Sequence, residues 1–314
     1  MKLICCITKI FPVSFLIGCS STQFVDLDPE ISTDNLKQSV LTLTSITPPR
    51  NYSNKKSLEK SVEYISQKFI EYGFTPKKQQ FNVNGTFYEN IVVSIGQQNG
   101  ERVIVGAHYD VCGNQPGADD NASGIAGLLE IARFAKEHED KLPYGVDIVA
   151  YCLEEPPFFG TTNMGSYVHA ASLHEKNIKV RGMICLDMIG FFTDEKNSQK
   201  YPLSIMRLFY PDKGNFISIV SNFGSSSLAN QLSRNYKYTS INAETLKAPS
   251  FITGVDFSDH RNYWKFGYDA VMITDTAFYR NPNYHDSSDT MGTLDFSKMK
   301  EVVKGICLTL INIK

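Results

Sequence analysis

Residues 106–124, GAHYDVCGNQPGADDNASG, combine one histidine and three aspartates with glycines and other small residues. Imidazole and carboxylate groups are ligands that zinc and other first-row divalent metals accept in proteins. Two such ions, about 3.5–4 Å apart, need a carboxylate that binds both. We therefore expect GADDNASG to supply this bridge, with its glycines allowing tight turns of the backbone beside the ions.

Metal-binding types of side chain follow apolar runs at four places along the chain. In chain order they are His108 and Asp110, Glu154 and Glu155, Asp187, and Asp275 with His285 ten residues later. In open α/β sheets, ligands bind at the carboxyl ends of the strands. The four groups should therefore meet at one edge of a sheet, and this convergence is a stronger signal than any single pair of acids.

The apolar runs alternate with helical patterns. The runs predict buried strands, and they are RVIVGA, VDIVAYCL, VRGMICL, NFISIV and YDAVMIT; the helical patterns cover 121–137, 164–176 and 225–236. This alternation is typical of a largely parallel sheet covered on both faces. We therefore expect an α/β fold with a mixed, largely parallel central sheet and helices on both faces.

The chain before residue 100 has other patterns. Apolar spacing predicts helices in 34–46 and 55–74, the second with a stripe formed by Leu58, Val62, Ile65, Phe69 and Ile70. Gly73 marks the expected end of that helix. Two strand-like segments, 77–84 and 86–96, predict a hairpin around Gly85.

Two later segments also carry expectations. Residues 193–214 form a long connection with proline, glycine and charged residues, and connections of this length inside a compact domain are usually functional. A short helix is expected to begin near His260. His138, His169 and His174 lie in polar helical surroundings and are expected to face solvent.

Composition excludes several classes of function. The 314-residue chain carries a net charge of −2, with 42% apolar and 20% charged residues, which is ordinary for a globular protein. This charge gives no electrostatic reason to expect a nucleic-acid partner. The sequence contains no P-loop and no GxGxxG, and the absence of GxSxG argues against a serine hydrolase.

The N-terminus is typical of an exported protein. Residues 1–18 combine a lysine with a short apolar stretch, which predicts a signal peptide rather than a spanning helix. The sequence LIGC resembles a lipoprotein lipobox with Cys19 as the lipidated residue; an ordinary signal peptide is the alternative. We expect a tether over 19–34, a single domain over 35–314, and contact with the membrane only through this lipid. Ser20 suggests the periplasmic side of the outer membrane.

The remaining cysteines are Cys112, Cys152, Cys185 and Cys307. Cys152 and Cys185 lie within apolar runs, where a free cysteine packs as a small hydrophobic residue. An exported protein could pair its cysteines, but we expect free thiols here. The lack of a CxxC spacing argues against a cysteine-based zinc site, so the expected ligands are imidazoles and carboxylates.

The order of the motifs resembles peptidase family M28, the di-zinc aminopeptidases. His-x-Asp, GADDNASG, Glu-Glu, Leu-Asp-Met and Tyr-His follow one another between about residues 85 and 295. The resemblance implies a zinc-exopeptidase fold of the phosphorylase/hydrolase-like type. It also implies two Zn²⁺ ions, other divalent metals being possible, held by five residues: His108 and Asp187 on one ion, Glu155 and His285 on the other, and Asp120 on both.

The resemblance further implies a metallo-exopeptidase that acts on peptides with a free N-terminus. Glu154 would be the general base that takes a proton from a metal-activated water. Asp110 would hydrogen-bond His108 and fix its tautomer, and Tyr284 would stabilise the oxyanion. The peptide bond from Asp120 to Asn121 would be cis.

Other functions remain open at this point. A glutaminyl cyclase-like acyltransferase would share the fold and use a single zinc. A carboxypeptidase would need a basic residue for the substrate carboxylate, for which Arg280 is a candidate. An inactive receptor-like module is the alternative outside enzymes, although none of the six key positions is missing. Asp119, Asp286 and Asp289 are expected in turns or loop caps, and Phe158 and Phe159 either line a pocket or pack in the core.

Overall fold

The computed structural model describes residues 24–25, 27–97 and 100–314. The predicted signal peptide and Cys19 lie outside these residues. Within the described part of the chain, no helix combines the length and the apolar character needed to cross a membrane.

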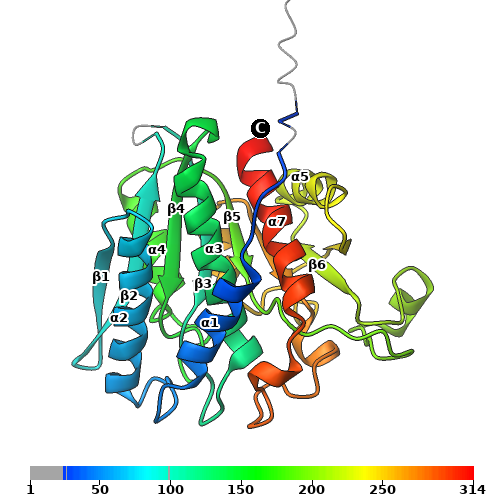
Figure 1. The fold of residues 1–314 in the computed structure, drawn as a ribbon, viewed down its shortest axis with the longest axis horizontal. Helices are drawn as coiled ribbons and strands as arrows, with labels where there is room; N and C mark the ends of the chain where they lie inside the picture. The colour runs from blue at the N-terminus through cyan, green and yellow to red at the C-terminus, as the bar shows by residue number, and fades with distance from the viewer. Residues whose placement is uncertain (1–23, 26, 98–99) are drawn as a thin grey trace, which may run out of the picture.

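An eight-stranded sheet runs through the centre of the molecule (Figure 1). Its strand order is β1-β2-β4-β3-β5-β8-β6-β7. The strands are β1 (Lys77–Val83), β2 (Thr86–Ile95), β3 (Arg102–His108), β4 (Gly145–Tyr151), β5 (Val180–Leu186), β6 (Phe216–Ser221), β7 (Asn242–Lys247) and β8 (Ala270–Thr274). β3 pairs in parallel with β4 and β5, as do β5 with β8 and β6 with β7, whereas β1–β2, β2–β4 and β6–β8 are antiparallel. The predicted mixed, largely parallel sheet is confirmed.

Helices cover both faces of this sheet. They are α1 (Thr33–Thr44), α2 (Lys55–Glu71), α3 (Gly124–Glu137), α4 (Gly165–Glu175), α5 (Ser226–Tyr236), α6 (His260–Lys265) and α7 (Phe296–Asn312). α3 contacts α1, α2 and α7, and α5 contacts α7, so these five helices form one layer; α4 and α6 pack together on the other side (Figure 1). All residues of β3 and β4 are buried because each face of the central strands lies under a helical layer.

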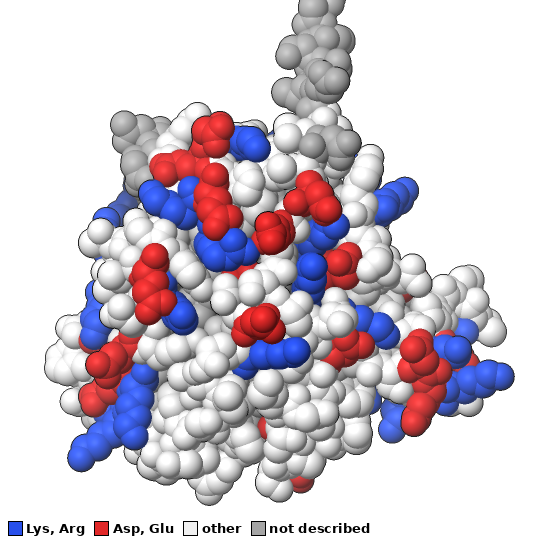
Figure 2. All heavy atoms as spheres, in the orientation of Figure 1, with Lys and Arg blue, Asp and Glu red and all other residues white. Residues whose placement is uncertain are grey.

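The outer surface of the five-helix layer carries charges of both signs. Figure 2 shows lysine and arginine side chains interspersed with aspartate and glutamate over this face. Several of them form ion pairs within one helix, such as Arg133 with Glu137 on α3 at 2.8 Å. Such exposed pairs contribute little to stability.

The structure corrects two predictions, one about the apolar face of α2 and one about where the folded domain begins. Ile70 was placed in the apolar stripe of α2, but its side chain is 52% exposed, while Phe69 beside it is fully buried. Adjacent residues of a helix point about 100° apart, so only one of them can face the core. The second correction concerns the predicted tether, 19–34: Ile31 is buried, and the backbone N–H of Ser32 donates to Glu130 of α3 at 2.8 Å. The folded domain therefore begins before residue 35.

Two elements have no counterpart among the predicted ones. β7 was missed because NAETLK lacks a continuous apolar run, and its residues are mostly half-buried. α7 carries a capping residue, Asp295, whose carboxylate accepts the N–H groups of Ser297 and Lys298 at 3.0 Å each. It fills the space between α3 and α5 and completes the five-helix layer.

The buried polar groups of the second face include one histidine that was expected in solvent. His169 of α4 is buried against α6, and its Nδ1 lies 2.7 Å from the hydroxyl of Tyr263. Burial lowers the pKa of His169 to about 4, so the imidazole is neutral at pH 7. The four cysteines from Cys112 to Cys307 are free thiols, as expected.

Candidate metal centre

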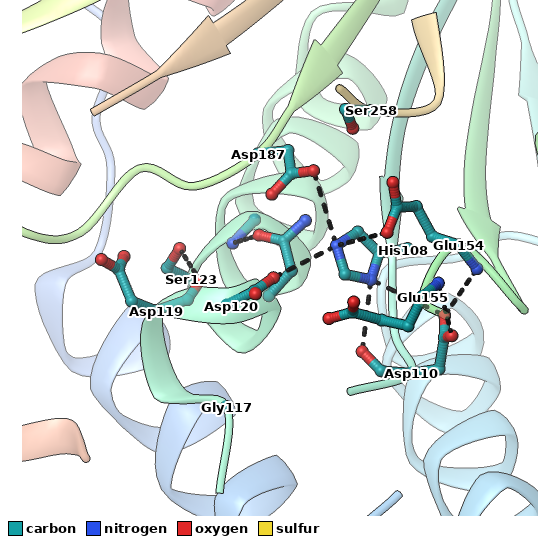
Figure 3. Close-up of polar contacts among 12 residues, drawn as sticks. His108, Asp110, Gly117, Asp119, Asp120, Ser123, Glu154, Glu155, Asp187 and Ser258 are labelled. Atoms are coloured by element: carbon teal, nitrogen blue, oxygen red, sulfur yellow. Dashed lines mark hydrogen bonds and ion pairs between the residues drawn. The ribbon is translucent and has the colours of Figure 1, made fainter. Parts of the chain in front are cut away.

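The carboxyl ends of three neighbouring strands and two loops bring the predicted ligands together (Figure 3). His108 is the last residue of β3, and Asp187 follows β5 directly. The loop after β4 carries Glu154 and Glu155. Asp120 lies in the segment η1 (Ala118–Ser123), which leads into α3 and whose backbone is kinked and non-helical at Asp120 and Asn121. His285 comes from the loop after β8 and joins the same group.

The two histidines face opposite oxygens of one carboxylate. His108 Nε2 is 3.4 Å from Asp120 Oδ1 and 3.6 Å from Asp187 Oδ2. His285 Nε2 is 3.1 Å from Asp120 Oδ2 and 3.3 Å from Glu155 Oε2. Asp120 therefore lies between two donor groups, each containing one imidazole and one further carboxylate. The peptide bond after Asp120 is cis, as the family resemblance implied.

Several of these atoms are buried without a hydrogen-bond partner. Within the described residues, they are Nε2 of His108, Nε2 of His285, Oδ2 of Asp120 and Oε1 of Glu155. Leaving a buried polar atom unpaired costs about 1–3 kcal/mol, so four in one place indicate a missing partner. Nitrogen and oxygen donors within 4.8 Å of one another, as in His108, Asp120 and Asp187, fit a divalent cation such as zinc.

The electrostatics of the centre are dominated by excess negative charge. Burial acts to lower the pKa of His108, but the carboxylates of Asp187 and Glu154 outweigh it and raise this pKa well above its usual range. His285 behaves alike: against the effect of burial, Asp120 and Glu155 raise its pKa to about 11. Burial, together with the charge on Asp120, raises the pKa of Glu155 to about 8. Protons are thus held where bound cations would replace them.

Asp110 hydrogen-bonds His108, as expected, but through its backbone carbonyl and not through its carboxylate. Its carboxylate oxygen Oδ1 lies 3.6 Å from His108 Nδ1, too far for a good hydrogen bond. The backbone carbonyl of Asp110 is closer, at 3.2 Å, and can accept the Nδ1–H of His108, which leaves Nε2 free for a metal. The carboxylate of Asp110 instead accepts the backbone N–H groups of Glu154 and Glu155, each at 3.2 Å.

The turn that carries Asp120 is held by a second acid. Asp289 accepts the backbone N–H of Asp119 at 2.8 Å and that of Asp120 at 3.1 Å, which confirms its expected role as a loop cap. Asp119 is no ligand: its carboxylate accepts the N–H of Gly190 at 2.9 Å and the amide of Asn281 at 2.7 Å. Both acids therefore fix the backbone on either side of the metal centre.

The position before this turn requires a glycine for steric reasons. Gly117 has φ +63°, in the left-handed region, and a Cβ there would collide with the backbone oxygen of Asp120. The expected tight turn is thus present.

Arg50 is a supporting residue that the sequence did not reveal. Its guanidinium is buried and donates to the carbonyl oxygens of Tyr109 at 2.9 Å and Gly117 at 2.6 Å, and also to that of Pro116. Burial lowers the pKa of Arg50 to about 10. It lies in the loop between α1 and α2, where nothing in the local sequence pattern distinguishes it from a surface arginine.

Two buried or half-buried groups beside the ligands were also not predicted. Cys112 places its sulfur within 4.8 Å of ligand atoms of Glu155 and His285, beside the expected imidazole and carboxylate ligands. Asp259, at the start of α6, is buried, and both its carboxylate oxygens lack a hydrogen-bond partner among the described residues. Burial raises the pKa of Asp259 to about 7.

The expected catalytic side chains lie at the same place. Glu154 is buried, and its Oε2 is 4.0 Å from His108 Nε2. Burial, reinforced by the charges of Glu155 and Asp187, raises the pKa of Glu154 well above its usual range. The ring of Tyr284 stacks on that of His285 with 3.8 Å between centroids.

A pocket of about 250 Å³ opens from the centre. Glu154, Tyr284 and His285 line it, and one face of β6, β7 and β8 forms a wall. The long connection also contributes lining residues, among them Tyr201, Met206 and Tyr210. Phe159 lines the pocket, whereas Phe158 packs against the core, which resolves the alternatives left open for this pair.

Arg280 does not reach this pocket. Its side chain is buried, donates from Nε to Gln199 at 2.8 Å, and lies 4.6 Å from the centroid of the Phe216 ring. It is absent from the pocket wall. The geometry therefore removes Arg280 as the candidate for binding a substrate carboxylate.

Comparisons with known proteins agree with this geometry. A sequence model of peptidase family M28 matches residues 90–310. The uncharacterized protein YfbL of Escherichia coli strain K12 is 42% identical over 292 residues, which make up 90% of this chain and 89% of that protein. Leucine aminopeptidase 1 of Ajellomyces capsulatus is 27% identical over 228 residues; the match covers 68% of this chain and 53% of that enzyme.

Solved structures share the fold. LapA of Legionella pneumophila is similar with a TM-score of 0.71 at 22% identity, over 90% of this chain and 73% of LapA. A glutaminyl cyclase of Bacteroides thetaiotaomicron has a TM-score of 0.70 at 19% identity, over 92% of this chain and 100% of that one.

Proposed function

The chain belongs to peptidase family M28, and on that premise we propose that it is a di-zinc aminopeptidase, which hydrolyses the N-terminal residue from peptides. One observation carries the proposal: the two oxygens of Asp120 face two separate imidazoles, of His108 and His285. A carboxylate in that position is the bridge that a pair of ions requires. The leucine aminopeptidase among the relatives supports the same activity.

Five residues would hold the ions. His108 and Asp187 would bind one, Glu155 and His285 the other, and Asp120 both, since donor atoms of all five converge there and those of all but Asp187 include a buried atom without a hydrogen-bond partner. When bound, a zinc pair supplies a water whose pKa is close to neutral and an electrophile for the scissile carbonyl.

The chain's own residues provide the proton transfers. Glu154 would take a proton on its carboxylate from the attacking water and pass it to the leaving amine. Its burial favours the neutral acid, which suits a group that must both accept and return a proton. Tyr284, beside His285 on the pocket wall, is assigned to donate a hydrogen bond to the oxyanion.

A second candidate is a glutaminyl cyclase-like acyltransferase, because a glutaminyl cyclase is among the structures with this fold. The two functions can be distinguished by measuring the metal content and the activity of the purified protein. Two zinc ions per chain, with chelator-sensitive cleavage of aminoacyl reporter amides, are expected for the aminopeptidase. One zinc ion, with cyclisation of glutaminyl peptides and no cleavage, would support the cyclase instead.

We also propose that the protein is exported and anchored through lipid on Cys19, on the periplasmic side of the outer membrane. The signal-like residues 1–18 and the LIGC sequence support this. In that location its substrates are peptides with a free N-terminus. Replacing Cys19 with alanine should release the protein from the membrane fraction, and continued membrane association of that variant would overturn the lipid assignment.

A further inference from the structure

The wall of the pocket that is formed by the sheet has two rows of side chains. Strand registers place Glu244 of β7 opposite Ser218 of β6, and Ser218 opposite Thr274 of β8. The neighbouring row, two residues further along β6 and β7 and two residues back along the antiparallel β8, is apolar. It consists of Leu246, Val220 and Met272. All six residues line the pocket, as expected for alternate residues on one face of a sheet.

Glu244 is an unpaired acid on this wall. Of the carboxylates that line the pocket among the described residues, it is the one outside the proposed ligands and base. It is half-buried, and burial raises its pKa. No described residue forms an ion pair or a hydrogen bond with its side chain. Lys200 also lines the pocket, but its side chain is exposed and forms no ion pair with Glu244.

Two tyrosines, Tyr201 and Tyr210, line the same pocket as Glu244. Burial raises the pKa of both hydroxyl groups, and the charge of Glu244 adds to this effect. Their hydroxyl groups are used elsewhere: Tyr201 donates to the carbonyl of Pro211 at 2.6 Å, and Tyr210 to that of Thr245 at 3.1 Å. The aromatic rings and the free carboxylate together form an environment that favours a cation.

The position of Glu244 also indicates a long ligand. β7 is separated from β5, which leads to Asp187, by β8 and β6. Three strand spacings of about 4.8 Å each place these strands roughly 14 Å apart. A substrate held with its scissile bond at the metal centre would need an extended side chain to approach Glu244.

From these observations we infer that Glu244 selects substrates whose N-terminal residue is lysine or arginine. The inference rests on the proposed aminopeptidase function and names the substrate class of that site. The side chain would lie along the apolar row and the tyrosine rings, and its cationic end would pair with Glu244. This pairing gives the carboxylate the partner that the chain itself does not supply.

The test compares lysyl and norleucyl reporter amides, because norleucine has the same straight carbon chain without the terminal amine. The zinc-loaded wild-type protein should have a kcat/KM at least ~10-fold higher for the lysyl amide, which corresponds to about 1.4 kcal/mol. Glu244→Gln should remove this preference, lowering kcat/KM for lysyl and arginyl amides while leaving the norleucyl value nearly unchanged. Glu195→Gln is the control, since Glu195 is exposed on the 193–214 connection, which also carries Tyr201 and Tyr210, and does not line the pocket.

Equal rates for the lysyl and norleucyl amides in the wild type would overturn the inference, as would an equal loss for both in Glu244→Gln. Metal content and thermal unfolding show whether that variant is folded. If the zinc-loaded protein cleaves no amide, the proposed function fails on its own, and calorimetric binding of lysinamide and norleucinamide then tests the pocket. Tighter binding of lysinamide that depends on Glu244 supports the inference, and equal binding of both amides contradicts it.

Discussion

The backbone N–H of Asp120 donates to the carboxylate of Asp289 at 3.1 Å, although 169 positions of the chain separate the two residues. The second oxygen of Asp289 accepts the N–H of Asp119. The loop after β8 thus fixes the turn that presents the proposed bridging ligand. Residues that orient metal ligands typically change metal affinity by about 10–100-fold when they are replaced.

Asp289→Ala should therefore weaken zinc binding by about 10–100-fold, because two backbone N–H groups beside Asp120 lose their acceptor. Competition with a chromophoric chelator measures this affinity. Asp286→Ala is the control, since Asp286 is exposed on the same loop and its carboxylate accepts hydrogen bonds from the neighbouring Ser287 and Ser288. Equal zinc affinity in Asp289→Ala and the wild type would show that this contact does not position the bridge.

Glu154→Gln should keep both metal ions but lose activity. The amide cannot take the proton from the attacking water, and general base catalysis contributes about 10²–10⁴-fold. The measurements are kcat on an aminoacyl amide and metal content of the same sample. Glu175→Gln on the exposed end of α4 should behave as the wild type. Near-normal turnover in Glu154→Gln would remove Glu154 from the role of base.

Arg50→Met should lower the free energy of unfolding by about 3 kcal/mol, because hydrogen bonds from a charged group contribute about 1.5–3 kcal/mol and buried carbonyls would lose their donor. Denaturant unfolding of the metal-free protein measures this loss. Arg207→Met, at an exposed position, should change it by less than about 0.5 kcal/mol. Similar values for the two variants would mean that Arg50 is not a structural support.

His169 should make the protein less stable in acid. Burial lowers its folded-state pKa to about 4, below the unfolded value of about 6.5, so the unfolded chain binds the proton first as the pH falls. Between about pH 6.5 and 4 this costs up to roughly 3 kcal/mol. Unfolding of His169→Gln over this range should depend less steeply on pH than that of the wild type. His260, whose pKa burial also lowers to about 4, contributes equally to both proteins.

Much of the sheet, and the convergence of the proposed ligands at its edge, could be predicted because both depend on local patterns. β3 and β5 are continuous apolar runs that end directly at His108 and Asp187, so fold and site come from the same signal. The supports of the site could not be predicted in this way. Arg50 is buried only because distant segments of the chain surround it, and the backbone contacts of Asp110 to Glu154 depend on how two loops meet.

Pocket walls were the least predictable part. Glu244 lies on β7, whose sequence has no strand-like apolar run, and its exposure to the pocket follows from pairing with β6. Ile70 was predicted to be buried but is exposed, because periodicity could not decide which of two adjacent apolar residues faces the core.

Anomalous diffraction from crystals of the zinc-loaded protein would show whether Asp120 joins two metal ions, as we propose. We expect two zinc ions about 3.5–4 Å apart, one at His108 and Asp187 and the other at Glu155 and His285, with one oxygen of Asp120 on each. A single ion, or a pair of ions of which Asp120 contacts one or neither, would contradict this proposal.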